Sequence, residues 1–226
     1  MKRKQLQFLL TLIFFAAAVA LYFMPHGDLR ISLAFPAFVL TLGSVCLSPW
    51  ALTMALLFCA VGDVMGVLGS LPGQMGAFAV GHLFFIFLLG RSVVESRPRV
   101  RIWLPAVAVG LAVLFVVGRN VIPVVPGVPL KIGCMVYALL LISVFGLAVM
   151  AALAGQQQNT CKPHTIVGWC AVVAAVGAGL FVFSDFVLAW NLFVERVAHA
   201  RYFIMCTYYS AILLLFVALT VGRMKR

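Results

Sequence analysis

Between Ile31 and Gly90 the sequence contains a single charged residue, Asp63. So few charges cannot coat a surface that faces water, because a soluble domain carries roughly 25% charged residues and this chain carries only 9%. Further charge-poor runs recur along the chain, and several exceed the ~20 residues that an α-helix needs to cross a bilayer. The sequence therefore predicts an all-α, polytopic membrane protein.

Turn signals divide the chain into a bundle of about eight transmembrane helices, which we expect to form one integral membrane domain over residues 1–226. The least obvious division falls at Ser48-Pro49, because proline disfavours helix for the residue before it. The N-terminal run also resembles a signal peptide cleaved after Ala20, but its apolar residues continue through Met24 and so reach membrane-spanning length. The expected spans are about 6–24, 29–47, 50–70, 75–94, 102–118, 131–153, 166–190 and 202–222.

The basic residues predict the orientation of these spans. With the N-terminus in the cytoplasm, the inner segments hold 11 of the 16 Lys and Arg residues, so both termini are expected to be cytoplasmic.

The net charge of +11 lies in short clusters and forms no basic helix face, so no nucleic-acid partner is expected. The short loops and the lack of appended domains fit a bacterial inner membrane. The oligomeric state is not indicated.

Several polar residues fall at one depth in this arrangement. Asp63 lies about seven residues, or ~10 Å, below the outer end of its span, and His82 lies at the same ~10 Å on the returning span. Asp185 lies ~8 Å below the outer end of the seventh span, and Tyr208 and Tyr209 lie ~10 Å down the eighth. Four separate spans therefore bring polar groups into one layer near the outer side of the membrane.

Ionised carboxyls inside hydrocarbon are costly, so intramembrane Asp residues are candidates for function. Desolvation favours the neutral carboxyl, and at least one of two close carboxyls is expected to be protonated near neutral pH. Asp63 and Asp185 would then form an acid–base pair; the alternative is a structural role in which they hydrogen-bond neighbouring helices. His82 is equally compatible with a site and with a satisfied interior hydrogen bond. The remaining histidines fall in loops, so neither a metal site nor a cofactor is expected.

Three stretches of sequence carry a family resemblance. They read GDVMGVLGSLPGQMGAFAVGHLFFIF (62–87), GLFVFSDFVLAWNLF (179–193) and TYYSAILLL (207–215). This pattern resembles the YhhN family of transmembrane lysoplasmalogenases, in which Gly-Asp is followed by Phe, Gly and His on the next helix, then by Ser-Asp and a Thr-Tyr-Tyr helix. The resemblance covers most of the chain in spacing and in its eight-helix layout.

The resemblance implies an enzyme that hydrolyses the vinyl ether bond of a lysophospholipid, releasing a fatty aldehyde and a glycerophospho-alcohol. Protonation of the vinyl ether creates an oxocarbenium-like cation, and two carboxyls play related parts in glycoside hydrolysis. We expect one of Asp63 and Asp185 to donate the proton and the other to stabilise the cation and orient water. The residues expected to bind substrate or to orient the acids are His82, Ser184, Asn191 and Tyr208.

One departure from the family pattern concerns the second span. Relatives often have Lys-Pro where this sequence reads Phe35-Pro36, so this protein is expected to handle a different headgroup or to contact it through Arg30.

Two other functions also fit buried acids. A proton-coupled transporter of small molecules or lipids would need them for coupling, and a non-catalytic lipid sensor would need them for assembly.

Overall fold

The computed structural model describes residues 3–24, 30–96, 103–155 and 168–224, and within these ranges the regular structure is helical. Seven helices are long and apolar enough to cross a membrane. This confirms the predicted all-α polytopic membrane protein. The α-helices are α1 (Arg3–Phe23), α2 (Phe35–Leu47), α3 (Trp50–Val67), α4 (Leu71–Ser96), α5 (Trp103–Asn120), α6 (Val128–Gly155), α7 (Trp169–Phe193) and α8 (Ala200–Met224).

The second predicted span differs from the others, because it consists of two pieces. A 3-10 helix, η1 (Arg30–Ala34), leads into α2, which has 13 residues. At 1.5 Å per residue α2 is about 20 Å long, shorter than the ~30 Å hydrocarbon core. Pro36 lies in the first turn of α2, where its missing N–H costs no hydrogen bond. The start of α2 is therefore set by proline.

The break between α2 and α3 falls at the predicted position. Ser48 is extended, with φ −120° and ψ 169°, as expected for a residue before proline. Pro49 is the N-cap of α3, and its carbonyl accepts a hydrogen bond from the Leu52 N–H at 2.9 Å. The Ser48 hydroxyl lies 2.6 Å from the Thr220 hydroxyl. The break is thus hydrogen-bonded to α8, which satisfies its polar groups away from water.

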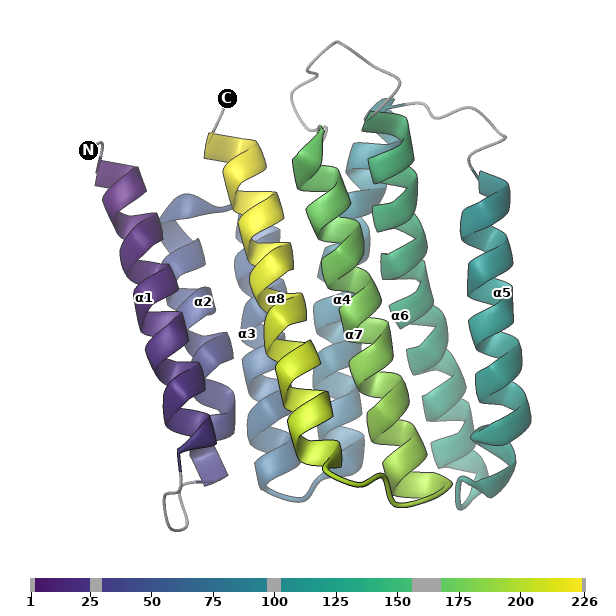
Figure 1. Cartoon of the computed structure of the whole chain (residues 1–226). Helices are drawn as coiled ribbons and strands as arrows, with labels where there is room; N and C mark the ends of the chain where they lie inside the picture. The colour runs from purple at the N-terminus through teal and green to yellow at the C-terminus, as the bar shows by residue number, and fades with distance from the viewer. Residues whose placement is uncertain (1–2, 25–29, 97–102, 156–167, 225–226) are drawn as a thin grey trace.

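The helices form one bundle in which α1 begins and α8 ends on the same side (Figure 1). The α3–α4 and α7–α8 hairpins lie at the opposite end, so we call this the hairpin end of the bundle. In the interior, α4 packs against both α3 and α6, and α7 packs against both α6 and α8. Helix α5 stands at the edge of the bundle and packs mainly on α6.

Small residues allow the helices of this bundle to approach closely. A Cβ atom on Gly62 of α3 would lie 3.0 Å from the Phe78 ring of α4. A Cβ atom on Gly81 of α4 would lie 3.1 Å from the Ala55 carbonyl oxygen of α3. Close packing at small residues is a common source of helix association in membranes, where no hydrophobic effect operates between helices. Gly62 and Gly81 therefore set the spacing of the α3–α4 hairpin.

Helices α7 and α8 approach each other closely at Gly177, and substitution there is expected to destabilise the bundle. An added Cβ would lie 3.1 Å from the Ala211 carbonyl oxygen and 3.2 Å from the Leu215 nitrogen. Because both atoms belong to the backbone of α8, Gly177→Ala is expected to cost about 1–3 kcal/mol. Thermal unfolding in detergent should show the loss. Gly146→Ala on α6 is the control, since its Cβ would meet nothing within 4 Å; equal unfolding temperatures for the two variants would contradict this packing.

Candidate active site

Asp63 is buried in the centre of the bundle and is held by a residue from α8. Its side chain is 1% exposed, and its Oδ2 accepts a hydrogen bond of 2.9 Å from the Tyr208 hydroxyl. Gly62, the residue before it, allows the Phe78 ring to pack on α3, and that ring meets the Tyr208 ring edge-on at 5.8 Å. The Gly-Asp pair thus places a carboxyl in a tightly packed, water-poor environment.

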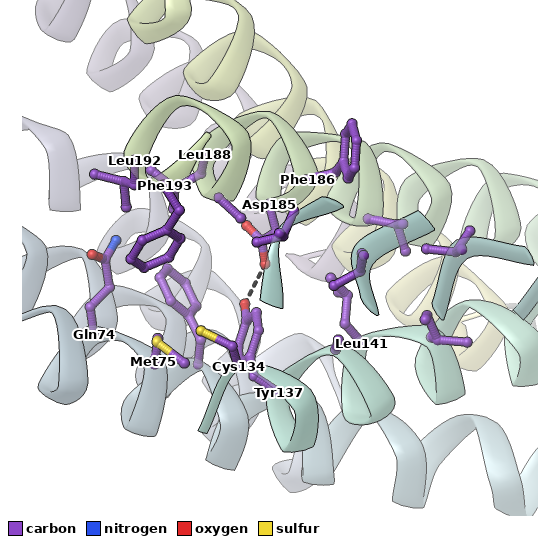
Figure 2. A pocket seen from close by; sticks show the side chains of 18 of the residues that line it. Gln74, Met75, Cys134, Tyr137, Leu141, Asp185, Phe186, Leu188, Leu192 and Phe193 are labelled. Carbon is purple, nitrogen blue, oxygen red and sulfur yellow. Dashed lines mark hydrogen bonds between the residues drawn. The ribbon is translucent and has the colours of Figure 1, made fainter. Parts of the chain in front are cut away.

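Asp185 is held in a similar way, by a different tyrosine. The Tyr137 hydroxyl of α6 donates a hydrogen bond to Asp185 Oδ2 on α7, as Figure 2 shows. Unlike Asp63, Asp185 is partly exposed and reaches a cavity between helices. Each of the two intramembrane carboxyls therefore has a tyrosine donor, but only Asp185 is accessible from the cavity.

A continuous set of aromatic rings connects the two carboxyl–tyrosine pairs. The Tyr208 ring lies 5.5 Å from the Phe181 ring, Phe181 lies 4.9 Å from the His82 ring, and His82 lies 5.4 Å from the Tyr137 ring. These contacts are edge-on, which is a favoured arrangement for aromatic pairs. The structure thus brings together the predicted residues Asp63, His82, Asp185 and Tyr208, which come from four different helices.

The cavity beside Asp185 is an apolar groove between the hairpin-end halves of α4, α5, α6 and α7. Its polar lining is limited mainly to Asp185, Tyr137 and Gln74. In Figure 2, Gln74 and Leu192 lie toward one end of the groove and Leu141 lies toward the other. The space within it is about 90 Å³, several times the ~10–15 Å³ that one water molecule requires. A slender apolar chain and a water molecule can therefore both reach Asp185.

Ser184 and Asn191, which were predicted as site residues, hydrogen-bond the backbone in the structure. The Ser184 hydroxyl donates to the Ile204 carbonyl of α8 at 3.0 Å. The Asn191 side-chain oxygen accepts a 3.0 Å hydrogen bond from the Val197 N–H in the α7–α8 loop. Ser184 thus ties α7 to α8, and Asn191 ties α7 to the loop that leads into α8.

The position at which the sequence departs from the family's Lys-Pro pattern lies away from the groove. Phe35 and Pro36 begin α2, which does not contribute to the groove lining. The side chain of Arg30, the predicted headgroup contact, lies outside the described part of the structure. Tyr209, predicted at the depth of the acids, donates a 2.9 Å hydrogen bond to the Leu33 carbonyl and so holds η1 against α8.

Tyr137 is the residue of this site that sequence reasoning did not identify. Tyrosine is common at membrane interfaces as an anchor or a packing residue, so the residue type alone does not single out Tyr137. A usable signal was nevertheless present, because Tyr137 lies six residues into the predicted span 131–153. That distance places it ~9 Å below the outer end, in the same layer as the acids.

Comparison with known proteins identifies the family. The model of the YhhN family matches residues 31–219. The chain belongs to the YhhN family. This confirms the resemblance predicted from the sequence, and the match includes both carboxyls and both tyrosines of the site.

The YhhN chain is also similar to three mammalian proteins named lysoplasmalogenase TMEM86B. It is 30% identical to the human protein over 164 residues, which are 71% of this chain and 59% of that protein. It is 57% identical to the pig protein over 35 residues, covering 16% of each chain, and 57% identical to the rat protein over 42 residues, covering 19% and 18%. The chain thus spans less than two thirds of the length of each relative. No solved structure matches it significantly.

The different exposure of the two carboxyls in this YhhN chain predicts different reactivity. An apolar carbodiimide, which reacts with carboxyl groups, is expected to modify Asp185 through the groove and to leave Asp63 unmodified. Mass spectrometry of peptides from the detergent-solubilised protein would locate the adduct. Asp185→Asn should abolish labelling of the α7 peptide; preferential labelling of Asp63 would contradict the accessibility described here.

Proposed function

We propose that this protein is an intramembrane hydrolase that cleaves the vinyl ether bond of lysoplasmalogens to a fatty aldehyde and a glycerophospho-alcohol. The observation that carries the proposal is a pair of tyrosine-held carboxyls in one buried layer, of which Asp185 opens to an apolar groove. Membership of the YhhN family and the name of the TMEM86B relatives support the same activity. The substrate is a lysophospholipid with an ethanolamine or choline headgroup.

The groove suits an amphiphile with a single hydrocarbon chain. From Asp185 to Phe193, which lines the groove near the hairpin end, α7 rises about 12 Å at 1.5 Å per residue. A headgroup can remain near the membrane surface over that distance while the ether bond reaches Asp185. The chain beyond the ether bond then extends along Leu141 and Ile142. A lipid with one chain fits this narrow space better than a lipid with two.

The reaction requires an acid, a stabilising negative charge and a water molecule. We assign the acid to Asp185, because it reaches the groove and its Oδ1 remains available for the proton while Tyr137 occupies Oδ2. Protonation of the β-carbon of the vinyl ether leaves an oxocarbenium-like cation. The hydrogen bond from Tyr208 stabilises the ionised form of Asp63 against the cost of burial, and Asp63 then supplies negative charge in a water-poor layer, where electrostatic stabilisation is strong. Water adds to the cation, and the hemiacetal collapses to aldehyde and alcohol.

The tyrosines fix the positions of the two carboxyls in this mechanism. Tyr208 orients Asp63 and Tyr137 orients Asp185, so Asp185 presents its free oxygen to the groove while Asp63 stays enclosed in the same layer. Ser184 and Asn191 contribute indirectly by fixing α7 against the segment that follows it. No cofactor enters these steps.

The hairpin end carries the site, and we propose that it faces the outside of the cell membrane, with both termini cytoplasmic. The distribution of Lys and Arg supports this orientation. The localisation most compatible with the short loops is a bacterial inner membrane.

Substitution of either carboxyl is expected to abolish aldehyde release without unfolding the protein. Loss of a general acid typically costs 10²–10⁴-fold in rate. The rate of aldehyde release by Asp185→Asn should therefore fall by at least ~10²-fold, and Asp63→Asn should also lose turnover. Aldehyde release from an ethanolamine lysoplasmalogen by purified protein in detergent is the measurement. Glu195→Gln, in the α7–α8 loop, is the control that should keep full activity.

Three results would contradict the proposal. Full activity in either Asp variant would exclude the mechanism. No aldehyde from the unsubstituted protein with either headgroup, together with substrate uptake into proteoliposomes driven by a pH gradient, would favour a proton-coupled transporter. Neither turnover nor transport would favour a lipid sensor.

Filling the groove should weaken substrate binding selectively. Ala189 lines the groove, so Ala189→Phe is expected to raise KM several-fold for a long-chain substrate by occupying the space of the hydrocarbon chain. The control is Ala112→Phe on α5, at an exposed position that does not line the groove. An unchanged KM in Ala189→Phe, measured as initial rates over a range of substrate concentrations, would place the substrate elsewhere.

A further inference from the structure

A backbone contact fixes the tautomer of the neutral His82 ring. Its side chain is 1% exposed, and its Nδ1 lies 2.5 Å from the carbonyl oxygen of Phe78, one helical turn earlier. A carbonyl oxygen can only accept a hydrogen bond, so Nδ1 must carry the hydrogen. In the neutral imidazole the other nitrogen, Nε2, then presents a lone pair.

This lone pair has no partner. Among the described residues, Nε2 of His82 is the one buried side-chain nitrogen or oxygen atom without a hydrogen bond. The nearby tyrosine hydroxyls are already engaged, because Tyr137 donates to Asp185 and Tyr208 donates to Asp63. Buried acceptors are rarely left unsatisfied in folded proteins, and bound water is a frequent partner for them. The arrangement therefore calls for a small hydrogen-bond donor at Nε2.

The position of the ring relates this donor to the candidate site. The His82 ring lies between Tyr137 at 5.4 Å and Phe181 at 4.9 Å. Tyr137 carries the hydrogen bond to Asp185, and Phe181 contacts Tyr208, the donor to Asp63. A molecule bound at Nε2 would thus lie in the layer of both carboxyls, close to Tyr137, which lines the groove.

We propose that Nε2 of His82 binds the water molecule that adds to the substrate and accepts its proton. The chemical step rests on the proposed vinyl ether hydrolysis. Asp185 transfers its proton to the β-carbon, and the water oxygen forms a bond to the resulting cationic carbon. The water's proton passes to Nε2, which gives an imidazolium and a neutral hemiacetal. Return of that proton from His82 to the Asp185 carboxylate restores both groups. The hemiacetal C–O bond to the glycerol oxygen then breaks as the hydroxyl proton passes to that oxygen, which releases aldehyde and alcohol.

Two substitutions of His82 distinguish the proposed role as a base from a purely structural role. His82→Asn keeps an N–H donor near the position of Nδ1, so the bond to the Phe78 carbonyl can persist, but it removes the acceptor at Nε2. His82→Gln places an amide oxygen near Nε2, which can accept a hydrogen bond from water but is not a base. Both variants are therefore expected to unfold near the normal temperature and to lose 10²–10⁴-fold in kcat, with KM changed little.

A second histidine provides the matched control. His199 lies exposed in the α7–α8 loop with a positive φ of 55°, a conformation that asparagine tolerates. His199→Asn should therefore fold and should keep normal kcat. If the unsubstituted protein releases aldehyde and His82→Asn or His82→Gln does so equally fast, His82 does not take the proton and the inference is overturned while the proposed function stands.

A measurement without substrate tests the water site itself. In detergent-solubilised protein with isotope-labelled histidine, a nuclear Overhauser cross-peak between water and the His82 ring proton beside Nε2 is expected, and it should be absent from His82→Asn. No such cross-peak in the unsubstituted protein would overturn the water site. If the unsubstituted protein releases no aldehyde, the proposed function and the chemical step fail together, while the cross-peak decides the water site independently.

Discussion

Two carboxyl groups in a nearly charge-free bundle depend on two tyrosine hydroxyls. Hydrocarbon offers no water to satisfy a buried carboxyl, so each must find a donor inside the protein. Tyr208 donates a hydrogen bond to Asp63, and Tyr137 donates one to Asp185. In each pair the partners come from different helices. The close packing at Gly62, and the bonds from Ser184 and Asn191 that fix α7 to the segment after it, hold these helices in register. These contacts keep the two acids in one layer.

The two carboxyl–tyrosine pairs differ in their access to the groove. Asp63 is enclosed, whereas Asp185 reaches a space lined largely by apolar side chains. Two nearby carboxyls with different surroundings are the usual basis for dividing acid and counter-charge roles between them. Placing the accessible acid within an apolar groove also lets a lipid approach without leaving the membrane. The proposed division of roles and the proposed single-chain substrate therefore rest on the same asymmetry.

The sequence alone predicted the helices well, because their physical signals are local. Charge-free runs defined the spans, and the restriction that Pro49 imposes on Ser48 located the break between α2 and α3. Counting residues from the span ends also predicted that Asp63, His82, Asp185 and Tyr208 share one depth. These predictions needed only the helical rise per residue and the thickness of the bilayer.

Other features depend on how the helices pack, which residue spacing does not reveal. Tyr137 shares the depth of the acids, but depth alone cannot show that its hydroxyl donates to Asp185. Asn191 belongs to the same motif as Asp185, yet its side chain turns toward the Val197 N–H in the loop. The groove arises from four helices, and its position could not be predicted before their order in the bundle was known.

The most direct test of the account is hydrolysis in water enriched in ¹⁸O. Purified protein and an ethanolamine lysoplasmalogen would be incubated in this water, and both products would be analysed by mass spectrometry. Water addition at the alkenyl carbon predicts free fatty aldehyde together with a glycerophospho-alcohol that contains no ¹⁸O, because the glycerol oxygen is retained. Absence of aldehyde, or ¹⁸O in the glycerol hydroxyl, would contradict cleavage of the vinyl ether bond by the Asp63 and Asp185 pair.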